Sequence, residues 1–159
     1  MRHTVTGSFV AASADRLGGF GVDQRLEQMC IRDRAELYVV TTPQPAAQKV
    51  AQRAAFMAEK VRLDVKGVIE NMSWFTGDDG TRYEIFGAGG GQELAETIDV
   101  PLLGRIPLVP KLREGGDDGH PIMAVDPESE AAQAFAAIAE RVDVELAPTR
   151  RYNPELTII

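Results

Sequence analysis

The chain has 159 residues and a net charge of −7, with 44% hydrophobic and 26% charged residues. This size allows one domain with a modest core, and the negative charge argues against nucleic acid or an anionic membrane as a main partner. No apolar run approaches the roughly 20 residues that span a bilayer, and the start lacks the apolar core of a signal peptide. The single cysteine, Cys30, cannot form an internal disulfide, so we expect a cytoplasmic protein.

The first 34 residues differ in pattern from the rest of the chain. Residues 1–28 show no sustained period of 2 or 3.6, which predicts irregular structure. The next six residues, Met29–Arg34, are what one reading frame of a transposase-end adapter used in DNA library preparation would encode. We hypothesise that residues 1–34 are an assembly artefact, foreign to the sequence from Ala35 onward. A natural short linker is the alternative.

A strand, a helix and a second strand are predicted from Ala35 onward. Leu37–Thr41 and Val65–Ile69 are short β-branched apolar runs, typical of buried parallel strands. Between them a helix is predicted to begin at Pro45, where a missing N–H is harmless. Its apolar residues recur with helical spacing and predict one buried face: Ala47, Val50, Ala51, Ala54, Met57, Ala58 and Val61. Strand, helix, strand is the parallel crossover unit.

The pattern beyond Asn71 predicts a hairpin and then a third strand. Asp79-Gly80 separates two aromatic-rich runs, which is a hairpin signal. We expect the hairpin aromatics to belong to the core: Trp74, Phe75, Tyr83 and Phe86. A glycine-rich turn at 87–91, a short helix over 92–98 and the strand Leu102–Ile106 come next.

The last part of the chain predicts one long loop and one helix. Residues 107–125 contain three prolines and three glycines, which indicates a functional loop. Asp126 and Pro127 are typical of a helix start. The expected buried stripe is Ala131, Phe135, Ile138, Ala139 and Val142, and residues 144–159 form a tail. The predicted fold class is α/β, a partial doubly wound sheet of about three parallel strands with flanking helices and a hairpin insertion.

Asn71 is the strongest candidate for a ligand contact. It follows a central strand at the edge where open α/β sheets bind ligands, and its amide offers both a donor and an acceptor. An Asn that caps its own turn is an equally good interpretation. The glycines at 87–91 imitate a dinucleotide fingerprint, but Gln92 stands where the last glycine should be. A flexible turn that caps a helix explains them better.

The other polar clusters carry weaker signals. Asp78-Asp79 and Asp117-Asp118 with His120 are expected to be solvated turns, because a metal site needs more ligands at defined spacing. Arg105 and Arg113 could approach a phosphate, although solvent-facing roles fit them better. Ser73 lies in no nucleophile elbow.

Six segments occur together in an order and at a spacing that resemble one family. They are Thr41–Gln44, Gly67–Ser73, Tyr83–Gly87 with its glycine run, Val100–Gly104, Ile106–Leu108 and Arg113–Asp117. From Ala35 to about residue 143 the chain resembles the C-terminal half of the Mrp/Nbp35 (ApbC-like) iron–sulfur cluster carrier P-loop ATPases. These are relatives of the cell-division ATPase MinD and of the nitrogenase iron protein.

The resemblance implies a nucleotide contact and a cargo. In the family, the Asn at the position of Asn71 contacts adenine, and the segment matching Ile106–Leu112, with Pro107 and Leu108, lies beside it largely through backbone. The family hydrolyses ATP with magnesium as homodimers. It is thought to hold a bridging 4Fe-4S cluster between Cys-x-x-Cys pairs and to pass it to apo-proteins.

Two family features are missing from this sequence. No cysteine stands near Thr76 and Asp79, where the Cys-x-x-Cys pair would fall, and thiolates are the usual ligands of such clusters. No G-x-x-x-x-G-K-[ST] phosphate loop occurs, nor the carboxylates that hold magnesium, and phosphoryl transfer depends on those groups. We therefore expect weak or undetectable ATP binding and no hydrolysis by this chain alone.

The missing half also predicts an exposed edge on the strand at Leu37, with poor stability and a risk of aggregation. Two alternatives to a cluster carrier remain. One is a fragment of a MinD- or ParA-type partition ATPase, and the glycine-rich hairpin argues against it. The other is a non-catalytic module that uses the aromatic hairpin to bind a protein partner.

Overall fold

The computed structural model describes residues 10–13 and 36–146. Four strands form the main sheet in the order β1-β2-β3-β6. β2 (Glu36–Thr41), β3 (Asp64–Asn71) and β6 (Leu102–Ile106) are parallel to one another, whereas β1 (Val10–Ser13) runs antiparallel to β2. The parallel three-stranded α/β sheet predicted from the sequence is confirmed.

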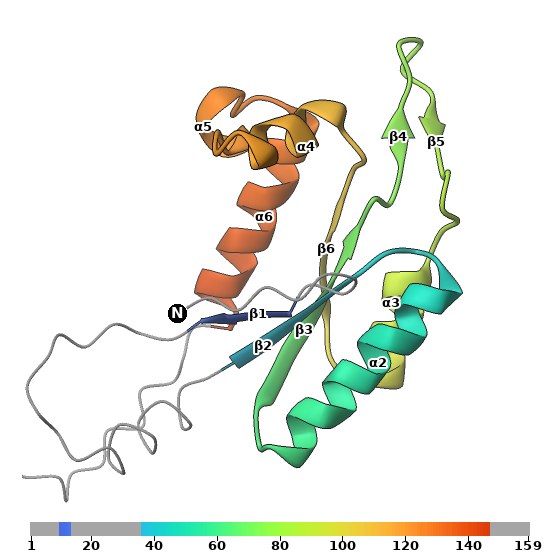
Figure 1. Cartoon of the computed structure of the whole chain (residues 1–159), viewed down its shortest axis with the longest axis vertical. Coiled ribbons are helices and arrows are strands. Elements are labelled where there is room, and N and C mark those ends of the chain that lie inside the picture. The colour runs from blue at the N-terminus through green and yellow to red at the C-terminus, as the bar shows by residue number, and fades with distance from the viewer. Residues whose placement is uncertain (1–9, 14–35, 147–159) are drawn as a thin grey trace, which may run out of the picture.

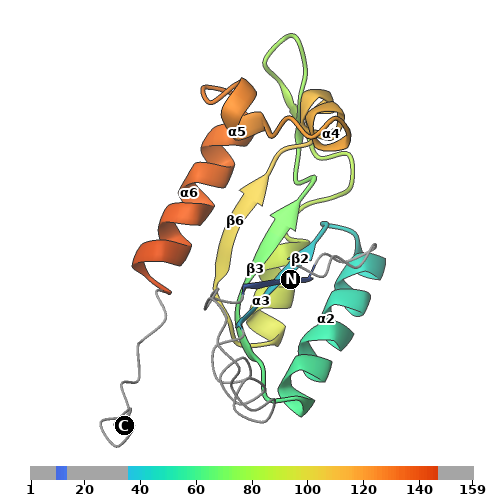
Figure 2. The same ribbon diagram turned by 60° about the vertical axis from the view of Figure 1, so that its left-hand side comes forward.

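Helices cover both faces of this sheet (Figures 1 and 2). α2 (Pro45–Lys60) and α3 (Gly90–Thr97) pack on one face, where buried Val39, Val68 and Leu94 form the core. α6 (Glu130–Val144) packs on the other face against a second cluster of Tyr38, Leu103, Ile106 and Ile138. Along β2 and β3, successive residues alternate between the two clusters: Leu37 and Val39 lie in the first and Tyr38 in the second, and Val68 and Ile69 divide in the same way.

The edge of β2 is not exposed along its whole length, which corrects two predictions. Residues 10–13, predicted to be irregular, form β1 and pair with residues 36–39 of β2. Unpaired N–H and C=O groups of an edge strand favour such pairing, and the short length of β1 concealed its signal in the sequence. The remaining expectations for residues 1–9, 14–35 and 147–159 lie outside the described residues.

α2 is rotated relative to its predicted buried face. The residues against the sheet are Ala51, Ala55 and Ala58, whereas Val50, Met57 and Val61 are 50%, 61% and 42% exposed. Alanines have small side chains, so the helix can approach the sheet closely. Because α2 carries apolar residues on more than one side, the periodicity of its sequence does not determine which side is buried. The predicted start at Pro45 agrees with the structure.

The segment 107–125, predicted to be a loop, contains two short helices. α4 (Pro110–Asp117) begins with a proline in its first turn, and α5 is Ile122–Val125. Gly115 was expected to lie in a loop, but it lies in α4. A side chain at this position would collide with the backbone carbonyl of His120. The glycine thus allows close packing inside a helix.

α6 starts later than the sequence predicted. Its N-cap is Ser129, whose hydroxyl accepts a hydrogen bond from the N–H of Ala132 at 3.3 Å, and Asp126 lies in the preceding turn. Ile138 and Ala131 are buried as expected, but Ala139 is exposed.

The predicted hairpin is present as β4 (Phe75–Thr76) paired with β5 (Arg82–Tyr83), and it extends beyond the sheet (Figure 1). Its aromatics are not core residues, which corrects another prediction. Tyr83 is 48% exposed, and Trp74, Phe75 and Phe86 are only half-buried. A hairpin projecting from the sheet has no second layer to cover it.

Candidate functional site

The three parallel strands end at the same edge of the sheet and bring the predicted site residues together. Asn71 pairs in register with Ile106, directly before Pro107. Beyond the strands, the N–H of Ser73 donates to the carbonyl of Ile106 at 3.0 Å, and the N–H of Leu108 donates to the carbonyl of Trp74 at 2.7 Å. The backbone segments 71–74 and 106–108 are therefore fixed side by side.

The Asn71 side chain is half-buried and only partly engaged. Its Oδ1 accepts a hydrogen bond from the N–H of Met72 at 2.9 Å, and Met72 has a φ of 57°, so Asn71 does cap its own turn. Its Nδ2 donates to no described residue. Capping uses the oxygen and leaves the amide donor available, so both interpretations of Asn71 are compatible with this geometry.

The backbone of Pro107 and Leu108 offers acceptors rather than donors. Pro107 is buried and has no N–H, and the N–H of Leu108 is already bonded to Trp74. The carbonyl oxygens of Pro107 and Leu108 accept no hydrogen bond from the described residues. Just after β2, the Oγ1 atom of Thr42 is buried and also has no hydrogen-bond partner among the described residues. A buried hydroxyl without a partner marks a position for a ligand or a water molecule.

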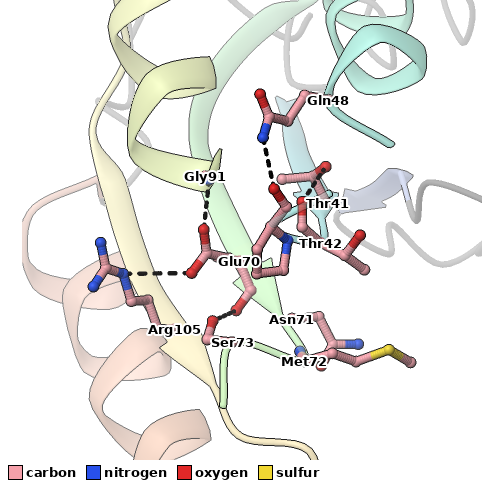
Figure 3. A network of polar contacts seen from close by, with 10 residues as sticks. Thr41, Thr42, Gln48, Glu70, Asn71, Met72, Ser73, Gly91 and Arg105 are labelled. Atoms are coloured by element: carbon pink, nitrogen blue, oxygen red, sulfur yellow. Dashed lines mark hydrogen bonds and ion pairs between the residues drawn. The ribbon is translucent and has the colours of Figure 1, made fainter. Parts of the chain in front are cut away.

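Glu70 is a buried carboxylate that was not predicted as a site residue from the sequence. It is 1% exposed, accepts a hydrogen bond from the N–H of Gly91 at 2.5 Å, and lies 3.5 Å from Nε of Arg105 (Figure 3). Because side chains alternate along a strand, Glu70 faces α3 while Asn71 faces the opposite side. Its signal in the sequence was a charged residue directly after a buried apolar run.

The glycine run lets α3 begin against the strand ends. Gly89 is the left-handed N-cap, as the helix-capping interpretation predicts. A side chain at Gly90 would collide with Gln48 and with the carbonyl of Pro43, which are themselves joined by a 2.8 Å hydrogen bond. The run thus serves close packing.

Glu130, the first residue of α6, fastens the hairpin to the body of the protein. Its carboxylate accepts hydrogen bonds from Nε1 of Trp74 at 3.1 Å, Oγ1 of Thr76 at 2.9 Å and Nη2 of Arg82 at 2.7 Å. Burial raises the pKa of Glu130, but the hydrogen bonds from Thr76 and Trp74 and the charge of Arg82 outweigh it, and the pKa lies below its usual value.

The hairpin carries no thiolate at the two positions that the resemblance marks. Thr76 is bonded to Glu130, and the Asp79 carboxylate accepts from the N–H and hydroxyl of Thr81 at 2.9 and 2.8 Å. Those bonds hold the pKa of the Asp79 carboxyl below its usual value. In the described part of the chain, no three His, Cys, Asp or Glu side chains group closely enough to hold a metal ion.

The remaining candidates lie at the surface. Asp78, Asp117, Asp118 and His120 are exposed, and Arg113 pairs with Asp117 at 3.4 Å. Arg105 is not simply solvent-facing, because it contacts buried Glu70. Among the described helices, none combines the length and apolar character needed to cross a bilayer.

A parallel sheet with helices on both faces and polar groups at its carboxyl edge defines a doubly wound α/β protein. Solved structures agree. The cell division ATPase MinD of Pyrococcus furiosus is 26% identical with a TM-score of 0.55, covering 80% of this chain and 49% of its own. MinD of Pyrococcus horikoshii, solved with Mg-ADP, is 27% identical with a TM-score of 0.55, covering 79% of this chain and 48% of its own.

Sequence comparison identifies the family. The family model "ParA: NUBPL iron-transfer P-loop NTPase" matches residues 21–143, so the chain belongs to this family. The iron-sulfur cluster carrier protein of Mycobacterium tuberculosis H37Rv is 44% identical over 133 residues, covering 74% of this chain and 35% of the relative. That of Deinococcus radiodurans is 48% identical over 102 residues, covering 64% and 29%.

The chain spans about a third of the length of these curated relatives. The family match begins at residue 21, ahead of Ala35, where the resemblance was expected to start, and it includes Met29–Arg34. The resemblance to iron–sulfur cluster carriers of the MinD superfamily is confirmed. The domain boundaries and the origin of residues 1–34 stay predictions.

Proposed function

We propose that this chain supplies the adenine-binding side of an ATP-dependent iron–sulfur cluster carrier. Asn71, Pro107 and Leu108 would hold the base. The observation that carries this proposal lies at the carboxyl edge of the central strands: among the described residues, the amide donor of Asn71 and the carbonyl oxygens of Pro107 and Leu108 have no hydrogen-bond partner.

This arrangement suits the hydrogen-bonding edge of adenine. The ring nitrogens of adenine are acceptors and its amino group is a donor, so the base needs one donor and one acceptor from the protein. Nδ2 of Asn71 can donate, and the carbonyl oxygen of Pro107 or Leu108 can accept. The turn at Met72 fixes Oδ1 of Asn71 and thereby orients the donor before a ligand arrives.

The triphosphate side of the reaction belongs to the remainder of the family domain. The 159 residues contain no G-x-x-x-x-G-K-[ST] sequence. ATP hydrolysis, magnesium binding and homodimer formation are therefore assigned to the whole protein, which we place in the cytoplasm. We expect this chain alone to bind ATP weakly and not to hydrolyse it.

The cargo in this proposal is a 4Fe-4S cluster, handed to apo iron–sulfur proteins. The described residues of the hairpin do not fit direct cluster ligation, because Thr76 and Asp79 have oxygen side chains already engaged by neighbours. Cluster ligation would have to use thiolates from elsewhere in the whole protein.

A pair of substitutions at Asn71 tests the adenine contact. Asn71→Asp keeps the oxygen that caps Met72 but loses the amide donor, whereas Asn71→Ala loses both. In NMR titrations of the full chain with ADP, we expect both variants to weaken binding by about tenfold, the effect of one good hydrogen bond. Wild-type affinity in Asn71→Asp would mean that Asn71 is only a cap.

A partition ATPase of the MinD or ParA type is the second candidate. It is supported by the two MinD structures at 26% and 27% identity. The relatives at 44% and 48% identity are iron-sulfur cluster carrier proteins, and this higher similarity favours the carrier.

A further inference from the structure

Ser73 is a buried polar residue whose role the adenine contact alone does not explain. It is 5% exposed and lies two positions after Asn71, the last residue of β3. Its hydroxyl donates a hydrogen bond to the carbonyl oxygen of Glu70 at 3.0 Å (Figure 3). Its N–H donates to the carbonyl oxygen of Ile106 at 3.0 Å. Ser73 therefore closes the turn over residues 70–73 and also fastens this turn to β6.

The turn that Ser73 closes has an unfavourable backbone. Met72 has a φ of 57°, in a region that bulky residues rarely adopt and that glycine or asparagine usually occupies. Such a conformation persists only where the surrounding contacts hold it. Two side chains provide contacts within the turn: Oδ1 of Asn71 accepts from the N–H of Met72 at 2.9 Å, and Ser73 donates to Glu70. The first bond is exposed and the second is buried, so water competes less with the bond of Ser73.

We infer that Ser73 is a positioning residue for the amide donor of Asn71. The inference rests on the proposed adenine contact and deepens it. Ser73 holds Met72 in its left-handed conformation, and the N–H of Met72 in turn holds Oδ1 of Asn71, which leaves Nδ2 in one orientation at the strand edge. Without the Ser73 hydroxyl, the backbone of Met72 relaxes and its N–H leaves Oδ1. The ligand then has to order the donor, which costs binding free energy.

Removal of the hydroxyl tests this role. Ser73→Ala keeps the N–H that bonds to Ile106 and loses only the bond to Glu70. In NMR titrations of the full chain with ADP, this variant should bind roughly two- to tenfold more weakly, which corresponds to the cost of ordering one side chain. In the ligand-free variant, the N–H of Met72 should exchange with water faster, because its hydrogen bond to Asn71 is populated less.

Two further variants serve as controls. Ser73→Cys keeps a side chain at this position but donates hydrogen bonds only weakly, so it should behave like Ser73→Ala and show that a cavity is not the cause. Thr97→Val removes a hydroxyl that donates to the carbonyl oxygen of Glu93 at 2.7 Å, near the end of α3. It loses a hydrogen bond of the same kind and should change neither the affinity for ADP nor the exchange at Met72.

A double-mutant cycle separates positioning from a general loss of stability. Asn71→Asp has already lost the donor, so adding Ser73→Ala should weaken ADP binding no further. Wild-type affinity in Ser73→Ala, additive losses in the double variant, or unchanged exchange at Met72 would each overturn the inference while leaving the adenine contact in place. Wild-type affinity in Asn71→Asp would instead overturn the adenine contact, and the positioning role with it.

Discussion

Removal of the Glu130 carboxylate should loosen the hairpin and lower stability. Three hydrogen bonds converge on this group, and each contributes about 0.5–1.5 kcal/mol when buried. Their sum must be discounted for solvent screening, because the side chains of Glu130 and Arg82 are 36% and 62% exposed. We therefore expect Glu130→Ala to reduce the free energy of unfolding by about 1–2 kcal/mol.

Urea denaturation measures this loss, followed by Trp74 fluorescence and by far-UV circular dichroism. The fluorescence of native Glu130→Ala should shift to longer wavelength, because the indole N–H loses its acceptor and the ring becomes wetter. Glu128→Ala is the matched control: Glu128 is an exposed residue just before α6, and its side chain bonds to no described residue. Equal stability of the two variants would refute the role of Glu130.

The pH dependence provides a second check on Glu130. Its pKa is lower in the folded protein than the ordinary value of 4.5, so its stabilisation is present above that value. The stabilisation is lost as the pH falls through the lowered pKa. The stability difference between wild type and Glu130→Gln should therefore be constant near neutral pH and shrink on acidification. A difference that persists in acid would contradict the assigned role of the carboxylate.

Three further substitutions test the packing at two glycines and the buried hydroxyl of Tyr38. Gly91→Ala should destabilise by about 1–3 kcal/mol in urea denaturation, because the new methyl group would lie 2.7 Å from Cβ of buried Glu70. At Gly116 no atom lies within 4 Å of an added Cβ, so Gly116→Ala should instead stabilise the protein by about 0.5–1 kcal/mol. Equal destabilisation by the two glycine substitutions would contradict the packing argument. Burial and the hydrogen bond to Glu36 raise the pKa of Tyr38 from 10.0 to about 12. The free energy of unfolding of wild type should therefore fall by on the order of 2 kcal/mol as the pH rises from 10 to 12. Tyr38→Phe should lack this alkaline loss, and parallel pH profiles would show that Tyr38 does not cause it.

The strand positions could be predicted because their signals are local. Leu102–Ile106 was predicted with the bounds that the structure has, and the second strand needed only a short extension to Asp64–Asn71. β-branched runs bounded by proline or polar residues determine such strands without reference to the rest of the chain. The start of α2 at Pro45 is local in the same sense.

Features that depend on distant contacts could not be predicted. The buried face of α2 depends on how closely its alanines approach the sheet, and the exposure of Tyr83 depends on whether anything covers the hairpin. The Glu130 cluster joins residues up to 56 positions apart, which no periodicity reveals. Asn71 was found because a polar residue at a strand end is a local signal, whereas the carbonyls beside it belong to a segment over 30 residues away.

The proposed adenine contact is best tested by a two-dimensional ¹⁵N NMR spectrum of the full chain during titration with ATP. We predict fast-exchange shifts, typical of weak binding, at the side-chain amide of Asn71 and at the backbone N–H of Leu108 and Val109. UTP at the same concentration should leave these signals unmoved. Shifts confined to other surfaces, or micromolar ATP affinity measured by calorimetry on this chain, would contradict the proposed division between an adenine side and a triphosphate side.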